Sequence, residues 1–110
     1  MTEHIYDEEC RRFQASAETV GKRWSGGILM ALYLGSTRFS EILGRVEGLS
    51  DRMLAQRLRE LEAEGLVERD VIPTVPVQIR YALTERGTDL MRALQPLAAW
   101  GQRWGTPARV

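Results

Sequence analysis

Hydrophobic residues in the first third of the chain recur every three or four positions, which is the spacing of amphipathic helices. One such stripe is formed by Phe13, Ala17, Val20 and Trp24. Residues 25–27 interrupt it, and Ser25 is suited to cap a short second helix that Gly35 ends. The pattern therefore predicts two consecutive helices before residue 36.

Two more helices, joined by a tight turn, are predicted next. The third covers residues 38–46 and the fourth residues 51–64, with the turn at residues 47–49 between them. Ser50 is suited to cap the fourth helix, and Gly65 ends it. The buried stripe of this helix is expected to be Leu54, Leu58 and Leu61. Because successive helical residues are about 100° apart, the opposite face carries Arg52, Gln56 and Arg59.

The spacing then changes to the two-residue alternation of strands. Residues 66–83 predict a β-hairpin with its tip at residues 73–76, where two prolines end the ladder. Thr84 is suited to cap a last helix over residues 84–104, which Pro96 is expected to bend. The chain thus ends in a hairpin followed by a long helix.

The apolar residues of this last helix predict a contact with another helix. They are Leu90, Leu94, Leu97, Gly101 and Trp104, with Trp100 beside them. Their average step of 3.5 residues is that of a helix packed along a second helix. We therefore predict a dimer interface here; the alternative is that the stripe closes the core of its own subunit.

This order of elements predicts one domain over residues 1–110, mainly α with a small β-hairpin. A helix–turn–helix followed by a hairpin is the winged helix-turn-helix layout, here with a C-terminal dimerisation helix over residues 84–104. The helix at 51–64 is then the recognition helix, which enters a major groove, and the hairpin at 66–83 is the wing. The implied partners are double-stranded DNA carrying a palindromic operator and a second copy of the chain.

The charge distribution is compatible with a nucleic-acid partner although the formal net charge is zero. Between residues 22 and 59, basic side chains exceed acidic ones by four. A neutral protein can still carry a basic face, although a charged face that is merely solvated has the same composition.

Candidate DNA contacts follow from the predicted geometry. Arginine pairs bidentately with guanine and glutamine with adenine, and a helix N-terminus favours phosphate. The candidates in the recognition helix are Ser50, Arg52, Met53, Gln56 and Arg59, and those for the backbone or wing are Arg38, Thr74 and Arg80. Arg57 lies at the edge of the buried stripe, so it either contacts phosphate or pairs with Glu41 or Glu60. Lys22 and Arg23 contact the backbone or simply solvate the end of the first helix.

Several classes of protein are not expected. The longest apolar run is too short to cross a bilayer, and the acidic N-terminus lacks the layout of a signal peptide. A single cysteine excludes an internal disulfide framework and favours the cytoplasm. His4 is the only histidine, and no metal-ligand spacing, phosphate loop or nucleophile elbow is present. We therefore expect no metal, no cofactor, no membrane partner and no catalysis.

Several segments together resemble the HxlR-type, MarR-like bacterial transcriptional regulators. They are Val20-Gly-Lys-Arg-Trp24, Leu34-Gly-Ser-Thr-Arg-Phe-Ser-Glu-Ile42, Gly48-Leu-Ser50, the run from Leu54 to Arg69, Pro73-Thr-Val-Pro76, Tyr81-Ala-Leu-Thr-Glu-Arg-Gly87 and Leu97-Ala-Ala-Trp-Gly101. The resemblance extends from about Cys10 to Gly101. It implies a homodimer, a winged helix-turn-helix fold and sequence-specific operator binding. It also implies repression or activation and, in several members, a response to oxidants or small electrophiles.

Cys10 is a candidate redox sensor through the same resemblance. Family members often carry a cysteine just before the first helix, and Cys10 matches that position. Arg11 stands where proline usually follows, and Lys22 and Arg23 stand where the family has glycine and lysine. The residues alone leave two roles open, because a lone cysteine is a reactive thiol or a small apolar filler.

Two other functions compete with operator binding. The winged helix can serve as a protein–protein module inside a larger assembly. Alternatively, aromatic residues can line a pocket for a small-molecule effector at the dimer interface; the candidates are Trp24, Tyr33, Trp100 and Trp104. Such a pocket is compatible with DNA binding, since an occupied effector site biases the spacing of the recognition helices.

Overall fold

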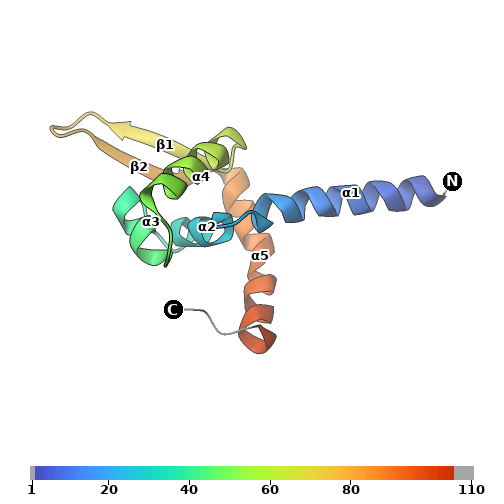
Figure 1. Cartoon of the computed structure of the whole chain (residues 1–110). Coiled ribbons are helices and arrows are strands. Elements are labelled where there is room, and N and C mark those ends of the chain that lie inside the picture. Colours follow the sequence, from blue (N-terminus) through green and yellow to red (C-terminus); the bar gives the residue numbers. More distant parts are fainter. Residues whose placement is uncertain (1, 106–110) are drawn as a thin grey trace.

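The computed structural model describes residues 2–105, with side chains from Asp7 onward; the side chain of His4 lies outside this part. Figure 1 shows the order of its elements along the chain. They are α1 (Thr2–Gly21), α2 (Ser25–Tyr33), α3 (Phe39–Arg45), α4 (Asp51–Ala63), β1 (Val67–Ile72), β2 (Gln78–Leu83) and α5 (Glu85–Trp104). The predicted fold class, mainly α with one hairpin and a C-terminal helix, is confirmed.

The core forms where α2 meets α3, α4, the base of the hairpin and the first half of α5. Its buried apolar residues are Ile28, Leu29, Ala31, Leu32, Ile42, Leu49, Leu54, Leu58, Leu61, Leu66, Val67 and Met91. The predicted leucine stripe of α4 is thus confirmed. Because all three leucines are buried, they fix the rotation of α4 about its own axis.

The hairpin is antiparallel, and its two faces differ. Arg69 pairs with Tyr81 in the ladder, and Asp70 pairs with Arg80. Since successive strand residues point to opposite faces, Arg69 and Tyr81 share one face while Asp70 and Arg80 share the other. The first face continues from the buried residue Val67, so it is the face turned toward α4 and the core.

The start of α2 differs from the prediction. Ser25 is the first residue of the helix and is buried, while Trp24 holds the cap position in a left-handed conformation with φ of 76°. In this turn the backbone N–H of Ser25 donates to the Lys22 carbonyl, and Trp24 packs against the core. Ser25 is therefore not an N-cap, because the chain turns one residue earlier than expected.

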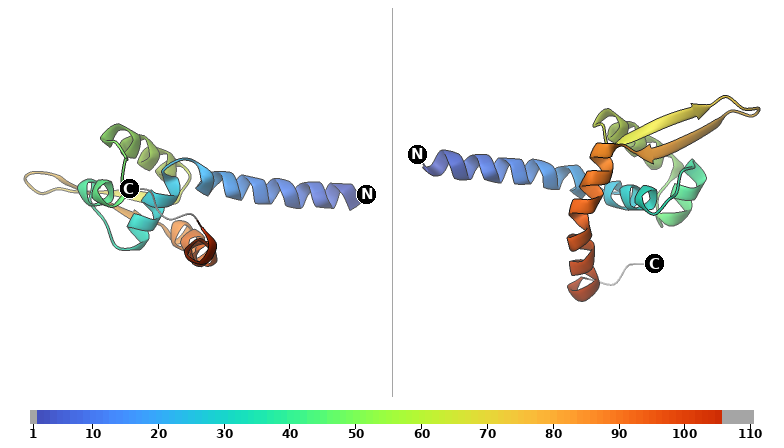
Figure 2. Two further views of the ribbon diagram at one scale, coloured as in Figure 1. Left: turned by 60° about the horizontal axis from the view of Figure 1, so that its bottom comes forward. Right: turned by 180° about the vertical axis from the view of Figure 1, so that it is seen from behind.

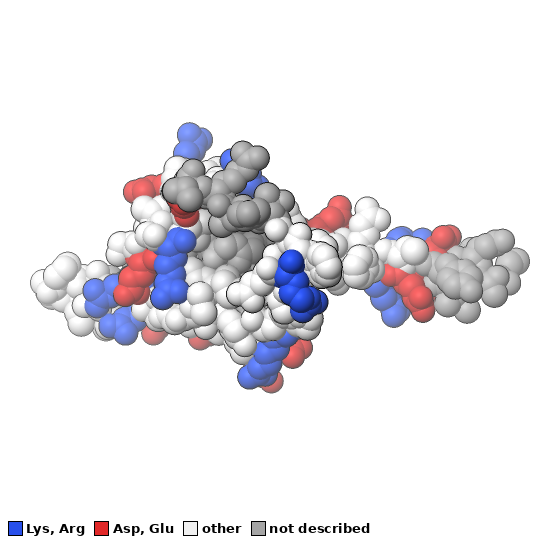
Figure 3. Space-filling view, turned by 90° about the horizontal axis from the view of Figure 1, so that it is seen from below, with Lys and Arg blue, Asp and Glu red and all other residues white. Residues whose placement is uncertain are grey.

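Helix α1 projects away from the core, as Figures 1 and 2 show. The molecule extends over 61 × 31 × 23 Å, with a radius of gyration of 16.1 Å, against about 13 Å for a compact chain of about 100 residues. Figure 3 shows side chains of both signs along this projecting helix. Within residues 2–105, no helix has the length and apolar character needed to span a membrane.

The expectation that Cys10 precedes the first helix is wrong. Cys10 lies in the middle of α1, which already begins at Thr2. Proline after this cysteine would favour an extended residue before it, and Arg11 imposes no such limit. An ion pair between Glu8 and Arg12, one helical turn apart, supports the helix across Cys10.

The junction between α4, β1 and α5 is tightly packed. The Thr84 hydroxyl donates to the Gly65 carbonyl at 2.6 Å and accepts from the Gly87 N–H at 3.0 Å, which confirms Thr84 as the cap of α5. Gly65 ends α4 with φ of 75°. A Cβ atom at Gly87 would collide with the Leu66 carbonyl oxygen, so this position requires glycine.

Replacement of this glycine is predicted to weaken the fold. Gly87→Ala should lower the free energy of unfolding by about 1–3 kcal/mol, because the new methyl group meets backbone that has little room to move. Thermal unfolding followed by circular dichroism measures the change. Gly44→Ala is the matched control: a Cβ there meets nothing within 4 Å, and it should stabilise α3 by about 0.5–1 kcal/mol. Equal melting temperatures for Gly87→Ala and the wild type would contradict the packing argument.

Candidate DNA-binding surface

The exposed side of α4 carries the side chains expected to contact bases. Arg52, Gln56 and Arg59 are all exposed, opposite the buried leucines, and together they form what we call the polar strip. Ser50 caps the helix, because its hydroxyl accepts from the Met53 N–H at 3.2 Å. Met53 itself is half-buried against the core. The polar strip therefore begins in the first turn of α4, where unpaired backbone N–H groups also face outward.

Arg57 belongs to the packing of the protein. It is only 8% exposed; its Nε donates to the Arg23 carbonyl at 2.9 Å, and its Nη1 donates to Glu60 at 3.1 Å. The structure thus favours pairing with Glu60 over the predicted phosphate contact. Buried guanidinium groups need such partners, and here the partners tie α4 to the segment before α2.

Glu60 collects three donors on one flank of α4. Lys22 forms a salt bridge with it at 2.9 Å, Arg57 contacts the same oxygen, and the Gln56 amide donates to the other oxygen at 3.3 Å. These hydrogen bonds, that from Lys22 first, lower the pKa of Glu60 below its ordinary value. Glu60 therefore remains ionised near neutral pH and neutralises charge on this flank.

Arg38 lies at the start of α3, where Glu41 organises the turn. The Glu41 carboxylate accepts from the backbone N–H groups of Thr37 and Arg38, both at 2.9 Å, and these bonds lower the pKa of Glu41. The Thr37 carbonyl in turn accepts from the Tyr81 N–H at 2.7 Å, which joins this turn to β2. Arg38 is exposed and borders a shallow pocket with Val77 and Gln78, so it lies beside the outer part of the hairpin.

The two wing candidates are placed less favourably than expected. The Thr74 hydroxyl donates to the Pro76 carbonyl at 2.8 Å, so its proton is already used within the tip. Arg80 is exposed on the hairpin face that looks away from α4, opposite Asp70 in the ladder. Arg80 therefore does not share a surface with the polar strip, as the alternation of the strand dictates.

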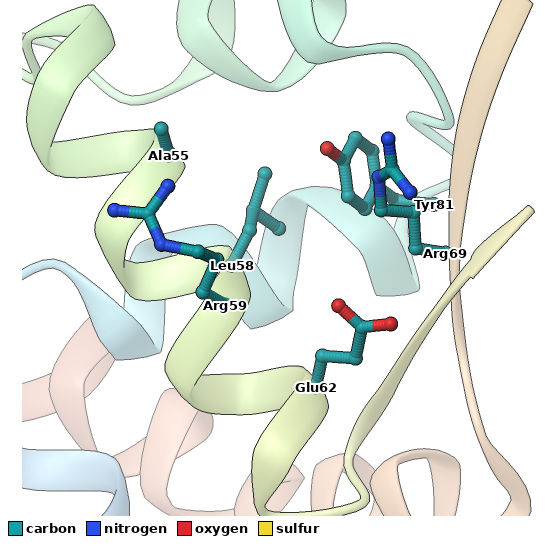
Figure 4. A pocket seen from close by; sticks show the side chains of 6 residues that line it. All are labelled: Ala55, Leu58, Arg59, Glu62, Arg69 and Tyr81. Atoms are coloured by element: carbon teal, nitrogen blue, oxygen red, sulfur yellow. The ribbon is translucent and has the colours of Figure 1, made fainter.

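A hollow of about 380 Å³ lies between α4 and the hairpin, beyond the point where the two pack together. The residues that line it are Ala55, Leu58, Arg59, Glu62, Arg69 and Tyr81. In Figure 4, Leu58 and Glu62 point into the gap from α4, while Arg69 and Tyr81 lie together on the other side. Sequence reasoning missed Arg69, although its two-residue spacing from buried Val67 assigns it to the inner face of the strand.

The predicted dimer stripe of α5 divides into two parts. Leu90 and Leu94 are half-buried and pack against the core of their own subunit. Beyond Pro96, three large apolar side chains are exposed: Leu97 by 58%, Trp100 by 52% and Trp104 by 74%. Gly101 lies exposed among them, and a Cβ there would meet nothing within 4 Å. The first half of the helix thus closes the core, and only the second half offers an apolar surface.

The four aromatic residues suggested for an effector pocket do not meet within one subunit. Trp24 packs against the core, with the Arg23 guanidinium 4.7 Å from its ring centroid, whereas Trp100 and Trp104 are exposed on the far half of α5. Tyr33 is partly exposed at the end of α2. Among the described side chains, no group of three metal-binding residues is found.

The known proteins that this chain resembles are transcriptional regulators. A family model described as HxlR-like helix-turn-helix matches residues 19–109. The uncharacterized HTH-type transcriptional regulator YvaP of Bacillus subtilis is 45% identical over 101 residues, which cover 92% of this chain and 94% of YvaP.

Two solved structures have the same fold. The reduced form of the transcriptional regulator YodB from B. subtilis is 40% identical, with a TM-score of 0.75 over 89% of this chain and 96% of YodB. The redox regulator HypR in its oxidized form is 31% identical, with a TM-score of 0.78 over 90% of this chain and 99% of HypR. With its winged helix, exposed polar strip and these relatives, this chain belongs to the HxlR-like helix-turn-helix family.

Proposed function

We propose that the chain is a sequence-specific, DNA-binding transcriptional regulator that acts in the cytoplasm as a homodimer on a palindromic operator. The exposed polar strip carries this proposal. Arg52, Gln56 and Arg59 have the chemistry for base edges in a major groove, and the buried leucines hold them outward. The free N–H groups after Ser50, together with Arg38 and the exposed part of Met53, are then the contacts that position the protein on the duplex.

The homodimer is supported by apolar surface that one subunit leaves uncovered. Phe13 of α1 is 77% exposed, and α5 exposes Leu97, Trp100 and Trp104 beyond Pro96. Most helical stability in proteins comes from tertiary packing, so α1, which projects from its own subunit (Figure 1), needs a partner surface to remain ordered. Two copies that cover these helices for each other would also hold two polar strips at a fixed separation, as the half-sites of a palindrome require.

Loss of a base contact is the first predicted outcome. The operator would be selected from random duplex DNA, and Arg52→Ala should then weaken binding to it by about 1–3 kcal/mol and relax the preference at one position of each half-site. Arg92→Ala, which removes an exposed arginine from α5, is the charge-matched control. Failure of the wild type to enrich any sequence would instead favour the protein–protein module.

Disruption of the apolar surface on α5 is the second predicted outcome. Leu97→Glu should convert the dimer into monomers, because a carboxylate would be buried between two apolar helices. Sedimentation equilibrium measures the mass, and circular dichroism checks the fold. Ala99→Glu adds the same charge on the opposite side of α5 and should remain dimeric. Leu94 is unsuitable for this test, because it also packs within its own subunit.

A response to oxidants through Cys10 is supported by two observations. Cys10 is exposed in α1, so within the subunit it is not an apolar filler. In addition, HypR is a redox regulator, and YodB has been crystallised in reduced, diamide-treated and quinone-bound forms. We infer that oxidation or alkylation of Cys10 changes how the two α1 helices pair and so changes operator affinity.

The thiol is tested by comparison with serine. Diamide should change the operator affinity of the wild type by tenfold or more, about 1.4 kcal/mol, and dithiothreitol should reverse the change. Cys10→Ser should bind with the affinity of the reduced wild type and show no response to diamide. A diamide effect that persists in Cys10→Ser would assign the response elsewhere, since the chain has one cysteine.

A further inference from the structure

We propose that the hollow between α4 and the hairpin holds a phosphate of the DNA strand that runs between the two grooves, with Arg69 as a phosphate-binding residue. This inference rests on the proposed DNA-binding function and deepens it. It adds a DNA contact from β1, and it proposes a ligand for the hollow that borders the polar strip.

The position of the hollow follows from the rotation of α4. With the leucines turned inward, Ala55 and Glu62 lie on the flank of α4 between the core and the polar strip, next to Arg59 at the edge of that strip, at about 100° per residue. The opposite flank carries Arg57 and Glu60, which are engaged with Lys22 and Arg23. On one side of the polar strip, the charged side chains are thus already paired within the protein. On its other side lies the open hollow.

The geometry of a duplex decides what enters this space. The major and minor grooves of B-DNA are separated by a single sugar–phosphate backbone. If α4 occupies a major groove and the hairpin reaches the adjacent minor groove, that backbone must cross the surface between them. The hollow is this surface, because α4 forms one wall and the paired strands form the other.

The lining of the hollow suits a phosphate. The lining residues carry a net charge of +1, from Arg59, Arg69 and Glu62. Arg69 lies across the gap from α4, whereas the Arg59 guanidinium extends along α4 toward Ala55 (Figure 4). Arg69 and Tyr81 are cross-strand partners in the hairpin, and the Tyr81 hydroxyl points across the gap toward α4 (Figure 4). Among the described residues, Arg59, Arg69 and Glu62 form no salt bridge. Arg69 is therefore available to an anion in the hollow, Glu62 opposes the anion, and Arg59 remains part of the polar strip at its border.

Salt dependence is the measurement that identifies a phosphate contact. Wild type and Arg69→Ala would be titrated onto the selected operator and onto a scrambled duplex of equal length, at several KCl concentrations. The plot of log affinity against log [KCl] should become shallower by about one per subunit, because one fewer counterion is released. The affinity ratio between the two duplexes should stay the same, because a phosphate contact carries no sequence information.

Three comparison variants make the assignment specific. Arg69→Lys keeps the charge and should keep most of the salt dependence, whereas Glu62→Gln removes the opposing charge and should tighten binding to both duplexes. Arg80→Ala removes the same charge from the other face of the hairpin and should change the slope less than Arg69→Ala. Melting curves check that each variant is folded.

The outcomes separate this inference from the proposed function. A wild type that binds neither duplex overturns both. A wild type that binds its operator, together with an unchanged slope for Arg69→Ala, overturns the phosphate site alone. Equal slope changes for Arg69→Ala and Arg80→Ala also overturn it, because only the total charge of the hairpin would then matter.

Discussion

The burial of Leu54, Leu58 and Leu61 is the constraint on which the functional surfaces depend. Three leucines on one side of a 13-residue helix leave it a single stable rotation against the core. That rotation turns Arg52, Gln56 and Arg59 to solvent, Arg57 and Glu60 toward the start of α2, and Glu62 toward the hairpin. Each flank of α4 consequently has its own chemistry, although charged and apolar residues are interspersed along its sequence.

Local signals in the sequence were sufficient to predict where α4 and α5 begin. Ser50 and Thr84 are caps because their hydroxyl groups accept from backbone N–H groups three residues later, a contact that depends on nearby residues alone. The start of α2 could not be predicted in this way. A tryptophan rarely adopts a left-handed conformation, and Trp24 does so because its ring packs against a core assembled from distant segments.

The candidate site shows the same division. The exposed face of α4 follows from helical periodicity, so Arg52, Gln56 and Arg59 were found. Choosing between Arg69 and Arg80 requires knowing which face of the hairpin meets α4, and that is set by tertiary packing. Arg57 was undecided in the sequence because its partner carbonyl, at Arg23, is 34 positions away. The upstream extent of α1 was missed because a family pattern placed Cys10 before the helix, and this chain lacks the proline that would stop it.

The links between α4 and the residues just after α1 have a mechanical consequence. Arg57 donates to the Arg23 carbonyl and Glu60 pairs with Lys22, so α4 is attached to the end of the long helix α1, which is the pivot when α1 tilts. Cys10 lies 12 residues before Lys22, which is ~18 Å along a helix, so a shift of ~3 Å at the thiol corresponds to a tilt of ~10° at the pivot. A change in the tilt of α1 therefore acts directly on two side chains of α4, without first deforming the apolar core.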